Sequence, residues 1–231
     1  MRVNLSRVLD RGICRVGFVM AKKSEKQVET ISDLPPFPTL VWDTYFWKAC
    51  VLLPSWKGFL SRGGAYGSSD SEAPSDGSVE MDVRPGLETG EGETPIPPFP
   101  EQGLGYQFLL ENDRAIRNQI VKAIFPYYAQ LREQYKDDFD ADEFEEMMPV
   151  LKKPGDLVQR RGLSIVHLLN IHHDGAAYIG FEIGCTWDEE HGVGVMTHQG
   201  RIVGVGQADT AFDEWVAKDD RKAMRKKTKG K

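Results

Sequence analysis

The stretch that decides the fold is Ala177-Tyr-Ile-Gly-Phe-Glu-Ile183, in which apolar side chains occupy every second position. This period of two is typical of a β-strand, because successive side chains of a strand point to opposite faces of the sheet. The residues His173-Asp-Gly175 come just before it and form a hairpin signal of the Asp-Gly type. The sequence therefore predicts a strand that follows a tight turn and turns Ile179 and Phe181 toward the core.

Strand-like segments lie on both sides of this stretch. Gly162–Ile171 precedes the Asp-Gly turn, and Gly192–His198 and Arg201–Gly206 follow, joined to each other by the turn Gln199-Gly200. Short apolar runs bounded by turn residues are typical of antiparallel strands. These segments predict a C-terminal β-meander.

The first half of the chain adds one longer strand and a helix. Trp42–Leu53 is rich in aromatic and β-branched residues, so we expect a strand that joins the meander at an edge and ends at Pro54. A short strand is also expected at Ser78–Val83. From Glu101 the apolar residues recur with helical spacing, and Pro126 should break or kink that helix before a second piece, Tyr127–Tyr135.

These elements predict an α+β fold. We expect an antiparallel sheet of about five or six strands, with the C-terminal β-meander as its main part and one long helix packed on a face. The expected core residues share the apolar positions of the strands and the helix. They are Phe46, Leu104, Phe108, Ile116, Ile120, Ile165, Ile179, Phe181, Ile183, Val195 and Val203.

Glycines gather on the face of the sheet opposite Phe181. Gly180 and Gly184 share that face with Glu182, and Gly194 and Gly204 lie on neighbouring strands. Glycine weakens a strand interior, so several together indicate close approach of another backbone or strong bending. Two interpretations stay open: a shallow groove across the sheet, or a curved sheet with a helix packed near it.

Length and composition indicate one globular domain with extensions. The chain has 231 residues, a formal net charge of −6, 40% hydrophobic residues and 28% charged residues. We expect a poorly ordered extension over residues 1–40, with translation starting at Met20, and a single domain over 41–217. A Gly-, Ser- and Pro-rich excursion is expected at about 61–103, and a basic tail at 218–231.

The same composition limits the classes of function. No run of about 18 apolar residues predicts a membrane span. Cys14, Cys50 and Cys185 form neither a metal-type pair nor a disulfide framework. The acidic balance argues against general nucleic-acid binding. We therefore expect a soluble cytoplasmic protein without a cofactor, a membrane or a nucleic-acid partner.

Two segments concentrate charge of opposite sign. Residues 137–146 are mostly Asp and Glu, with departures from the spacing of a calcium-binding loop, so they predict a solvated acidic turn or short helix. Residues 218–231 are mostly basic. Such a tail suits phosphate or an acidic partner, or it is simply the solvated end of a helix.

The densest polar motif is Gly184-Cys-Thr-Trp-Asp-Glu-Glu-His-Gly192, between two predicted strands. Trp187, Asp188, Glu189, Glu190 and His191 are its candidate binding residues. Three alternatives compete with a purely structural role in the hairpin. The loop presents Trp187 and its acids to a basic partner protein. It binds a metal through Asp188, Glu190 and His191, with His198 or His167 completing the shell. It pairs Cys185 with His191 as a nucleophile.

Four stretches of the chain resemble a family of uncharacterised bacterial domains of unknown function. They are Leu53–Gly64, Gly162–Leu168, Tyr178–Val195 and Ala208–Phe212, and the specific part is the signature G-C-x-W-D-E-E-H-G-x-G-V. The resemblance covers roughly Phe46 to Trp215 outside the Gly/Ser/Pro-rich stretch. It implies no activity, cofactor or catalytic residue, and only a gene-context association with toxin–immunity systems.

The motif lacks a complete catalytic constellation, so we assign no catalytic residue and expect a protein that is not an enzyme. The leading hypothesis is a non-enzymatic protein-binding module, of the immunity type in one version. The alternative is a small metal-assisted hydrolase that uses Asp188, Glu190, His191 and His198. The third is a stable domain in which the motif only shapes the hairpin.

Overall fold

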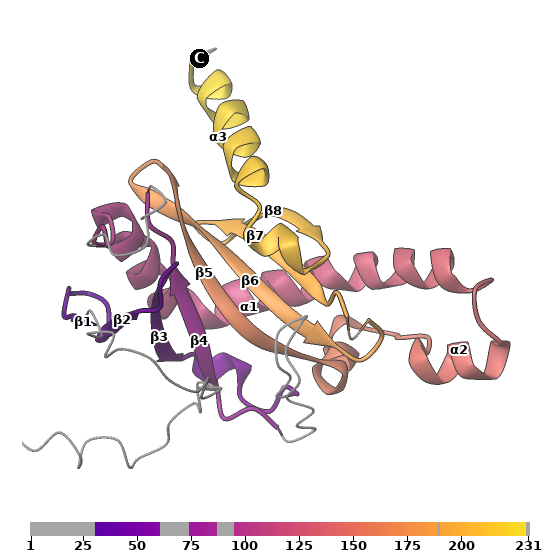
Figure 1. Ribbon diagram of the computed structural model, residues 1–231. Helices are drawn as coiled ribbons and strands as arrows, with labels where there is room; N and C mark the ends of the chain where they lie inside the picture. Colours follow the sequence, from indigo (N-terminus) through magenta and orange to yellow (C-terminus); the bar gives the residue numbers. More distant parts are fainter. Residues whose placement is uncertain (1–30, 61–73, 87–94, 189, 230–231) are drawn as a thin grey trace, which may run out of the picture.

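A single mixed sheet organises the molecule (Figure 1). The computed structural model describes residues 31–60, 74–86, 95–188 and 190–229. Eight strands follow one another across the sheet in chain order. They are β1 (Ile31–Ser32), β2 (Leu40–Trp42), β3 (Trp47–Leu52), β4 (Ser78–Val83), β5 (Arg161–His173), β6 (Ala176–Cys185), β7 (Val193–His198) and β8 (Arg201–Gly206).

Neighbouring strands are antiparallel except for β4 and β5, which run parallel. The chain between these two strands contains the long helix α1 (Pro100–Tyr135), the short helix α2 (Ala141–Met147) and a 3-10 turn, η3 (Pro154–Arg160). A parallel pair needs such a crossover, because its two strands must enter the sheet from the same end. The predicted α+β class and the C-terminal meander are confirmed, but the expected number of strands was too low.

The extra strands come from the N-terminal part of the chain. The segment predicted as one strand, Trp42–Leu53, is divided between β2 and β3 by a turn. The Asp43 side chain stabilises this turn by accepting hydrogen bonds from the backbone N–H groups of Tyr45 and Phe46 at 3.2 and 3.1 Å. The segment reaches the meander through β4, not directly. The predicted short strand Ser78–Val83 is confirmed as β4.

The sheet also includes residues before position 41. Residues 31–40 contain β1 and the start of β2, and both Phe37 and Leu40 are buried in the core. Part of the segment that was expected to be a poorly ordered extension therefore contributes to the described sheet.

Helix α1 covers one face of the sheet, behind the strands in the view of Figure 1. Gln102 fixes its first turn: the Oε1 atom accepts from the Phe99 N–H, and the Nε2 atom donates to the carbonyls of Arg84 and Leu168 at 2.8 and 3.1 Å. The helix passes through Pro126 without ending, so of the predicted break or kink the break is wrong, and Tyr127–Tyr135 belongs to the same helix.

Most of the predicted core is confirmed, including Ile116, Ile120 and Phe181. Leu104 is the clear error, because it is 53% exposed. At its start the helix packs closely through small residues instead: a Cβ on Gly105 would lie 3.5 Å from Ala177. The buried face therefore includes Gly105 and Leu109 and leaves Leu104 on the flank.

The opposite face of the sheet is covered by the segment after β8, which forms a 3-10 turn, η4 (Ala208–Ala211), and helix α3 (Glu214–Lys229). A Cβ on Gly180 would lie 1.5 Å from the carbonyl oxygen of Ala211, and a Cβ on Gly194 would lie 2.4 Å from that of Gln207. The glycines therefore allow η4 to lie directly on the strands, as the second of the two open interpretations predicted.

Candidate functional site

The motif between β6 and β7 is organised by Asp188. Its Oδ1 atom accepts a hydrogen bond from the backbone N–H of His191 at 2.9 Å and lies 3.1 Å from the Nδ1 atom of that imidazole. Its carbonyl accepts from the Cys185 thiol at 3.3 Å and from the Gly192 N–H at 3.1 Å. Gly192 has a φ of +62°, which favours glycine. These contacts hold the loop in one shape.

Trp187 is buried in this loop, with 4% of its surface exposed. Its indole meets the Tyr128 ring of α1 edge-on, with 4.8 Å between ring centroids. The indole Nε1 has no hydrogen-bond partner among the described residues. Trp187 therefore does not protrude as an anchor for a partner but forms part of a wall.

That wall borders a hollow of about 270 Å³ between the loop and the C-terminal end of α1. We call it the Trp187 hollow, and its lining consists of Tyr135, Asp138, Phe139, Met147, Trp187, Asp188, Glu190 and His191. The lining combines aromatic rings with three carboxylates and contains no Lys or Arg. The side chain of His191 is about half exposed, so the hollow opens to solvent. Such a lining attracts a cation through both charge and ring faces.

The residues of the metal alternative are not all brought together. His191 precedes β7 and His198 ends it, so a whole strand separates the two imidazoles. The Nε2 atom of His198 lies 2.9 Å from the His173 carbonyl, at the other end of the sheet. Glu189 lies outside the described residues. Among the residues that the structure describes, no group of three or more His, Cys, Asp or Glu side chains is placed to hold a metal ion.

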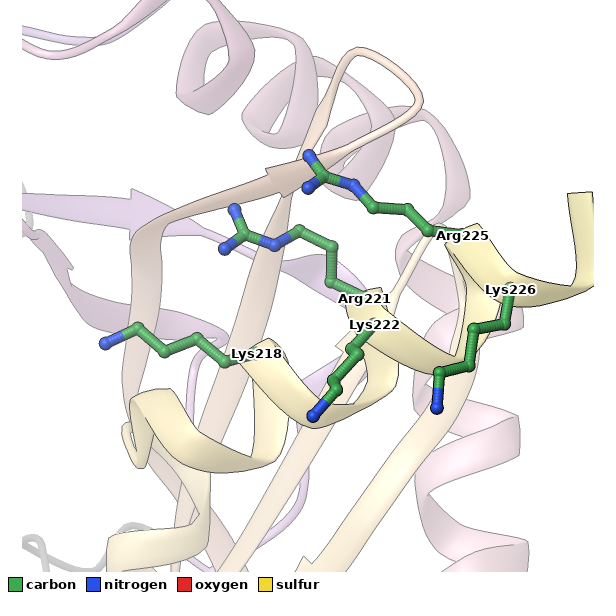
Figure 2. Close-up of a pocket in the computed structure, with 5 residues that line it drawn as sticks. All are labelled: Lys218, Arg221, Lys222, Arg225 and Lys226. Carbon is green, nitrogen blue, oxygen red and sulfur yellow. The ribbon is translucent and has the colours of Figure 1, made fainter. Parts of the chain in front are cut away.

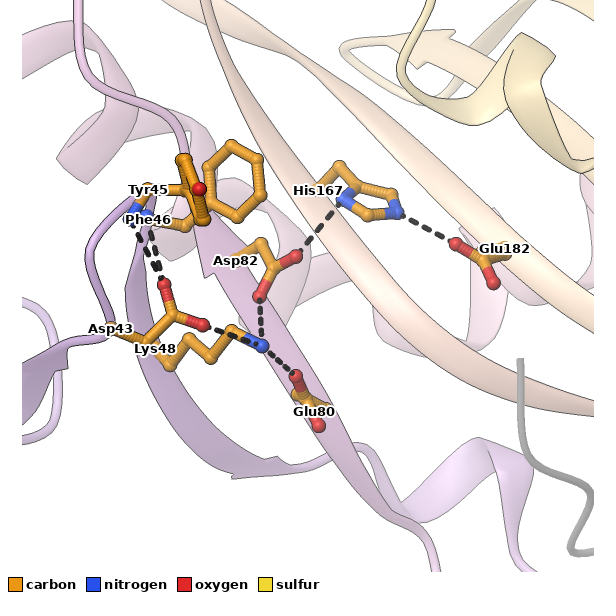
Figure 3. A network of polar contacts seen from close by, with 8 residues as sticks. All are labelled: Asp43, Tyr45, Phe46, Lys48, Glu80, Asp82, His167 and Glu182. Atoms are coloured by element: carbon orange, nitrogen blue, oxygen red, sulfur yellow. Dashed lines mark hydrogen bonds and ion pairs between the residues drawn. The ribbon is translucent and has the colours of Figure 1, made fainter. Parts of the chain in front are cut away.

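A second polar cluster lies on the sheet itself, formed by residues that the sequence pattern does not bring together (Figure 3). His167 of β5 stands between two carboxylates: its Nδ1 atom is 3.6 Å from Asp82 of β4, and its Nε2 atom is 3.2 Å from Glu182 of β6. All three side chains are buried. The Phe212 ring packs edge-on against the imidazole, with 5.2 Å between centroids. The cluster is therefore closed to a substrate.

Lys48 extends this cluster toward β3. Its Nζ atom contacts Glu80 and Asp43 at 2.9 Å each and Asp82 at 4.0 Å. Burial lowers the pKa of Lys48, but its hydrogen bonds to Glu80 and Asp43 raise it further, so the net change is upward. Burial raises the pKa of Asp82 to about 6, although the nearby His167 and Lys48 act in the opposite direction. The Asp82 carboxyl thus changes its charge in the weakly acidic range.

The register of the strands explains why this cluster was not visible in the sequence. Asp82 and His167 are direct neighbours in the parallel pairing of β4 with β5. Glu182 of β6 lies opposite Ile165, two residues from His167 on β5, so its side chain reaches His167 diagonally across the same face of the sheet. In the sequence His167 was a candidate only for the metal shell. It is buried in the structure, and its Nδ1 atom has no hydrogen-bond partner among the described residues.

Helix α3 carries a strip of basic side chains (Figure 2). Lys218, Arg221, Lys222, Arg225 and Lys226 line one shallow surface on successive turns. Trp215, at the base of the helix, is 72% exposed, and the Lys218 ammonium lies 5.5 Å from its ring. The basic segment is helical through Lys229, and Arg201 and Tyr178 attach its first turns by contacts to Asp220 at 2.6–2.9 Å.

Fold and sites together define an α+β protein with a helix-covered apolar sheet face, a charged opposite face and an acidic aromatic hollow at one end. No described helix has both the length and the apolar character that a membrane span requires.

The family model described as "Domain of unknown function (DUF6985)" matches residues 83–212, more than half of the chain, and the chain belongs to this family. The matched region contains His167, Glu182 and the Trp187 loop. No curated protein and no solved structure matches the chain.

Proposed function

We propose that the protein is a non-enzymatic binding module that accepts a lysine or arginine side chain of a partner protein in the Trp187 hollow. The observation that carries this proposal is the composition of the lining, which joins three aromatic rings and one histidine to three carboxylates and contains no lysine or arginine. A cation over a ring face gains about 0.5–2 kcal/mol, and carboxylates at the rim add charge attraction.

The size of the hollow supports the same proposal. Pockets for cofactors and drug-sized ligands have volumes of about 300–1,000 Å³. The Trp187 hollow, at about 270 Å³, falls below that range and suits a single side chain. Because Trp187 is itself buried, the partner supplies the inserted residue and this protein supplies the socket. A basic toxin domain is the kind of partner that an immunity-type role requires.

The test uses an acetylated peptide that carries one arginine among glycine and serine residues. Isothermal titration should give a dissociation constant on the order of 1 mM, since only one side chain is anchored. Glu190→Gln and Asp138→Asn should each weaken binding about three- to tenfold, while Glu146→Gln, an exposed acid outside the lining, should not.

A peptide with glutamate in place of arginine serves as the ligand control and should not bind. Equal affinity for the two peptides, or equal loss in the Glu146→Gln control, would contradict the proposal. A titration of zinc and manganese in the same protein addresses the hydrolase alternative, because stoichiometric metal lost in His191→Ala would favour that alternative instead.

A further inference from the structure

Helix α3 continues past the contacts that attach it to the sheet. Ala217 belongs to a small buried cluster with Tyr178 and Met196, and Asp220 binds Arg201 and Tyr178. Beyond Asp220, none of the α3 side chains whose exposure the structure describes is buried, and the helix extends beyond the sheet (Figure 1). Packing on the sheet therefore does not account for the second half of α3.

The basic side chains of this helix form what we call the α3 strip. It consists of Lys218, Arg221, Lys222, Arg225 and Lys226. The helix as a whole contains seven Lys or Arg residues against three Asp or Glu residues, so it is strongly basic although the chain is acidic. Glu214 contacts Lys218 at 2.6 Å, but no described carboxylate forms an ion pair with the other four side chains of the strip. Most of the positive charge of the strip is therefore available to a ligand.

The end of a helix attracts cations, but this effect does not explain the strip. The field of the helix dipole acts mainly within the last turn, and Lys218 and Lys222 lie before the last turn of a helix that ends at Lys229. Lys218, Lys222 and Lys226 follow one another at intervals of four residues, and like charges at this spacing destabilise a helix. The strip therefore costs folding free energy, which an anionic ligand would offset.

An exposed tryptophan continues the strip toward the start of α3. Trp215 precedes Lys218 by three residues, a spacing that places both on one face of the helix. Its side chain is 72% exposed, and the Lys218 ammonium lies 5.5 Å from its ring. Among the described residues of α3, Trp215 is the only large apolar side chain that is exposed, so the helix lacks the apolar face that lies in a membrane surface. An acidic peptide would pair with the cations but offers no flat group to the ring.

We propose that α3 binds a single-stranded nucleic acid, with phosphates along the α3 strip and one base on the ring of Trp215. Lysine and arginine neutralise phosphates whatever the sequence, and an exposed aromatic ring stacks on any base. The helix rises about 16 Å from Trp215 to Lys226, which spans several phosphates at roughly 3.4 Å each along a stacked strand.

The net charge of −6 argued against general nucleic-acid binding, but it is a sum over the whole chain, whereas the basic residues of α3 lie together on one helix. The α3 strip shares no residue with the lining of the Trp187 hollow. Binding at α3 thus goes beyond the function proposed for the hollow and does not depend on it.

Fluorescence anisotropy of a labelled oligothymidylate of about twelve nucleotides tests this binding in the full-length protein. At about 50 mM salt we expect a dissociation constant on the order of 10 μM. The logarithm of the binding constant should fall against the logarithm of the salt concentration with a slope of about −3, because each neutralised phosphate of a single strand contributes roughly −0.7.

Three variants separate the contributions of charge and stacking. Lys222→Gln combined with Lys226→Gln should weaken binding at least about tenfold and reduce the steepness of the salt dependence by about 1.4. Trp215→Leu should weaken binding about five- to fiftyfold and leave the salt dependence unchanged, because it removes stacking but no charge. Arg114→Gln combined with Lys122→Gln removes two exposed cations from α1, and this matched control should bind like the wild type.

An abasic oligonucleotide of the same length keeps the phosphates and lacks the bases. The wild type should bind it as weakly as Trp215→Leu binds oligothymidylate. Equal affinity of wild type and Trp215→Leu for oligothymidylate, or no loss in the double variant of the strip, would overturn the proposal. Tighter binding to polyglutamate or to phosphatidylserine vesicles would also overturn it, and would identify an acidic protein or a membrane surface as the ligand instead.

Discussion

The two faces of the central strands are built on different principles. The face under α1 is filled by side chains such as Val79, Met81 and Phe181, which need only the right volume and an apolar surface. The opposite face carries His167 between two carboxylates and glycines that admit η4. The stability of this face depends on the charged partners of His167 and on the close approach of the η4 backbone to the glycines. The apolar face should therefore tolerate substitution by side chains of similar shape, whereas the charged face should not.

The largest effect is expected on the apolar face. Phe181→Ala should lower the free energy of unfolding by about 3–5 kcal/mol, because it leaves a cavity between the sheet and α1. Phe181→Leu, which keeps most of the volume, should cost roughly 1.5 kcal/mol or less. Urea unfolding of the three proteins measures both values. Similar losses in the two variants would contradict the idea that this face needs only volume.

On the charged face the strongest prediction concerns pH. The folded-state pKa of Asp82 is about 6, above its ordinary value of 3.8, because burial disfavours the carboxylate. The folded protein therefore binds the Asp82 proton more tightly than the unfolded chain does. This difference stabilises the fold fully below pH 3.8, and the stabilisation is lost as the pH rises through 6. The difference between pKa values of 3.8 and about 6 corresponds to about 3 kcal/mol of folding free energy.

The measurement is the free energy of unfolding of wild type and Asp82→Asn between about pH 4 and pH 7. The stability of the wild type relative to the variant should fall across this range by up to about 3 kcal/mol. Asp142→Asn, at an exposed position in α2, is the control and should follow the wild type. Parallel curves for wild type and Asp82→Asn would show that Asp82 does not titrate as described.

The smallest of the three effects tests the close approach of η4. Gly180→Ala should destabilise the protein by about 1–3 kcal/mol, because its Cβ would overlap the Ala211 carbonyl and force η4 away. Gly155→Ala is the matched control, since a Cβ there meets nothing within 4 Å. Thermal unfolding compares the two. An unchanged melting temperature in Gly180→Ala would mean that η4 moves aside without cost.

The sequence predicted the meander well because its signals are local. The period of two in β6 and the turns at Asp174-Gly175 and Gln199-Gly200 lie within a few residues of one another. Asp174 and Gln199 both adopt positive φ in the structure, as such turns require. The glycines of β6 and β7 also indicated the close approach of another backbone, which in the structure is that of η4.

The errors have two kinds of cause. The turn between β2 and β3 is a local signal that the apolar pattern of Trp42–Leu53 concealed, because a single Asp43 side chain forms it by accepting hydrogen bonds from the N–H groups two and three residues further on. The other errors have non-local causes. Leu104 follows the helical period, but close packing at Gly105 moves the buried face away from it. Asp82 meets His167 only because β4 and β5 run parallel after a long crossover.

The candidate site was found in part. The motif was recognised from its density of polar residues, and the structure places Trp187, Asp188, Glu190 and His191 around one hollow. The other half of the lining, including Tyr135 and Asp138, comes from the end of α1 and the following turn. Nothing in the sequence links these residues to the motif, because only the packing of α1 on the sheet brings them near.

If the Trp187 hollow holds a basic side chain, the NMR signal of the Trp187 indole N–H should respond when that side chain enters. Two-dimensional ¹H–¹⁵N spectra follow this signal, assigned with Trp187→Phe, during titration with the arginine peptide. We expect a saturable shift of the Trp187 signal and no shift for Trp56, with the response strongly reduced in Glu190→Gln. An unmoved Trp187 signal at saturating peptide, or an equal response in Glu190→Gln, would contradict it.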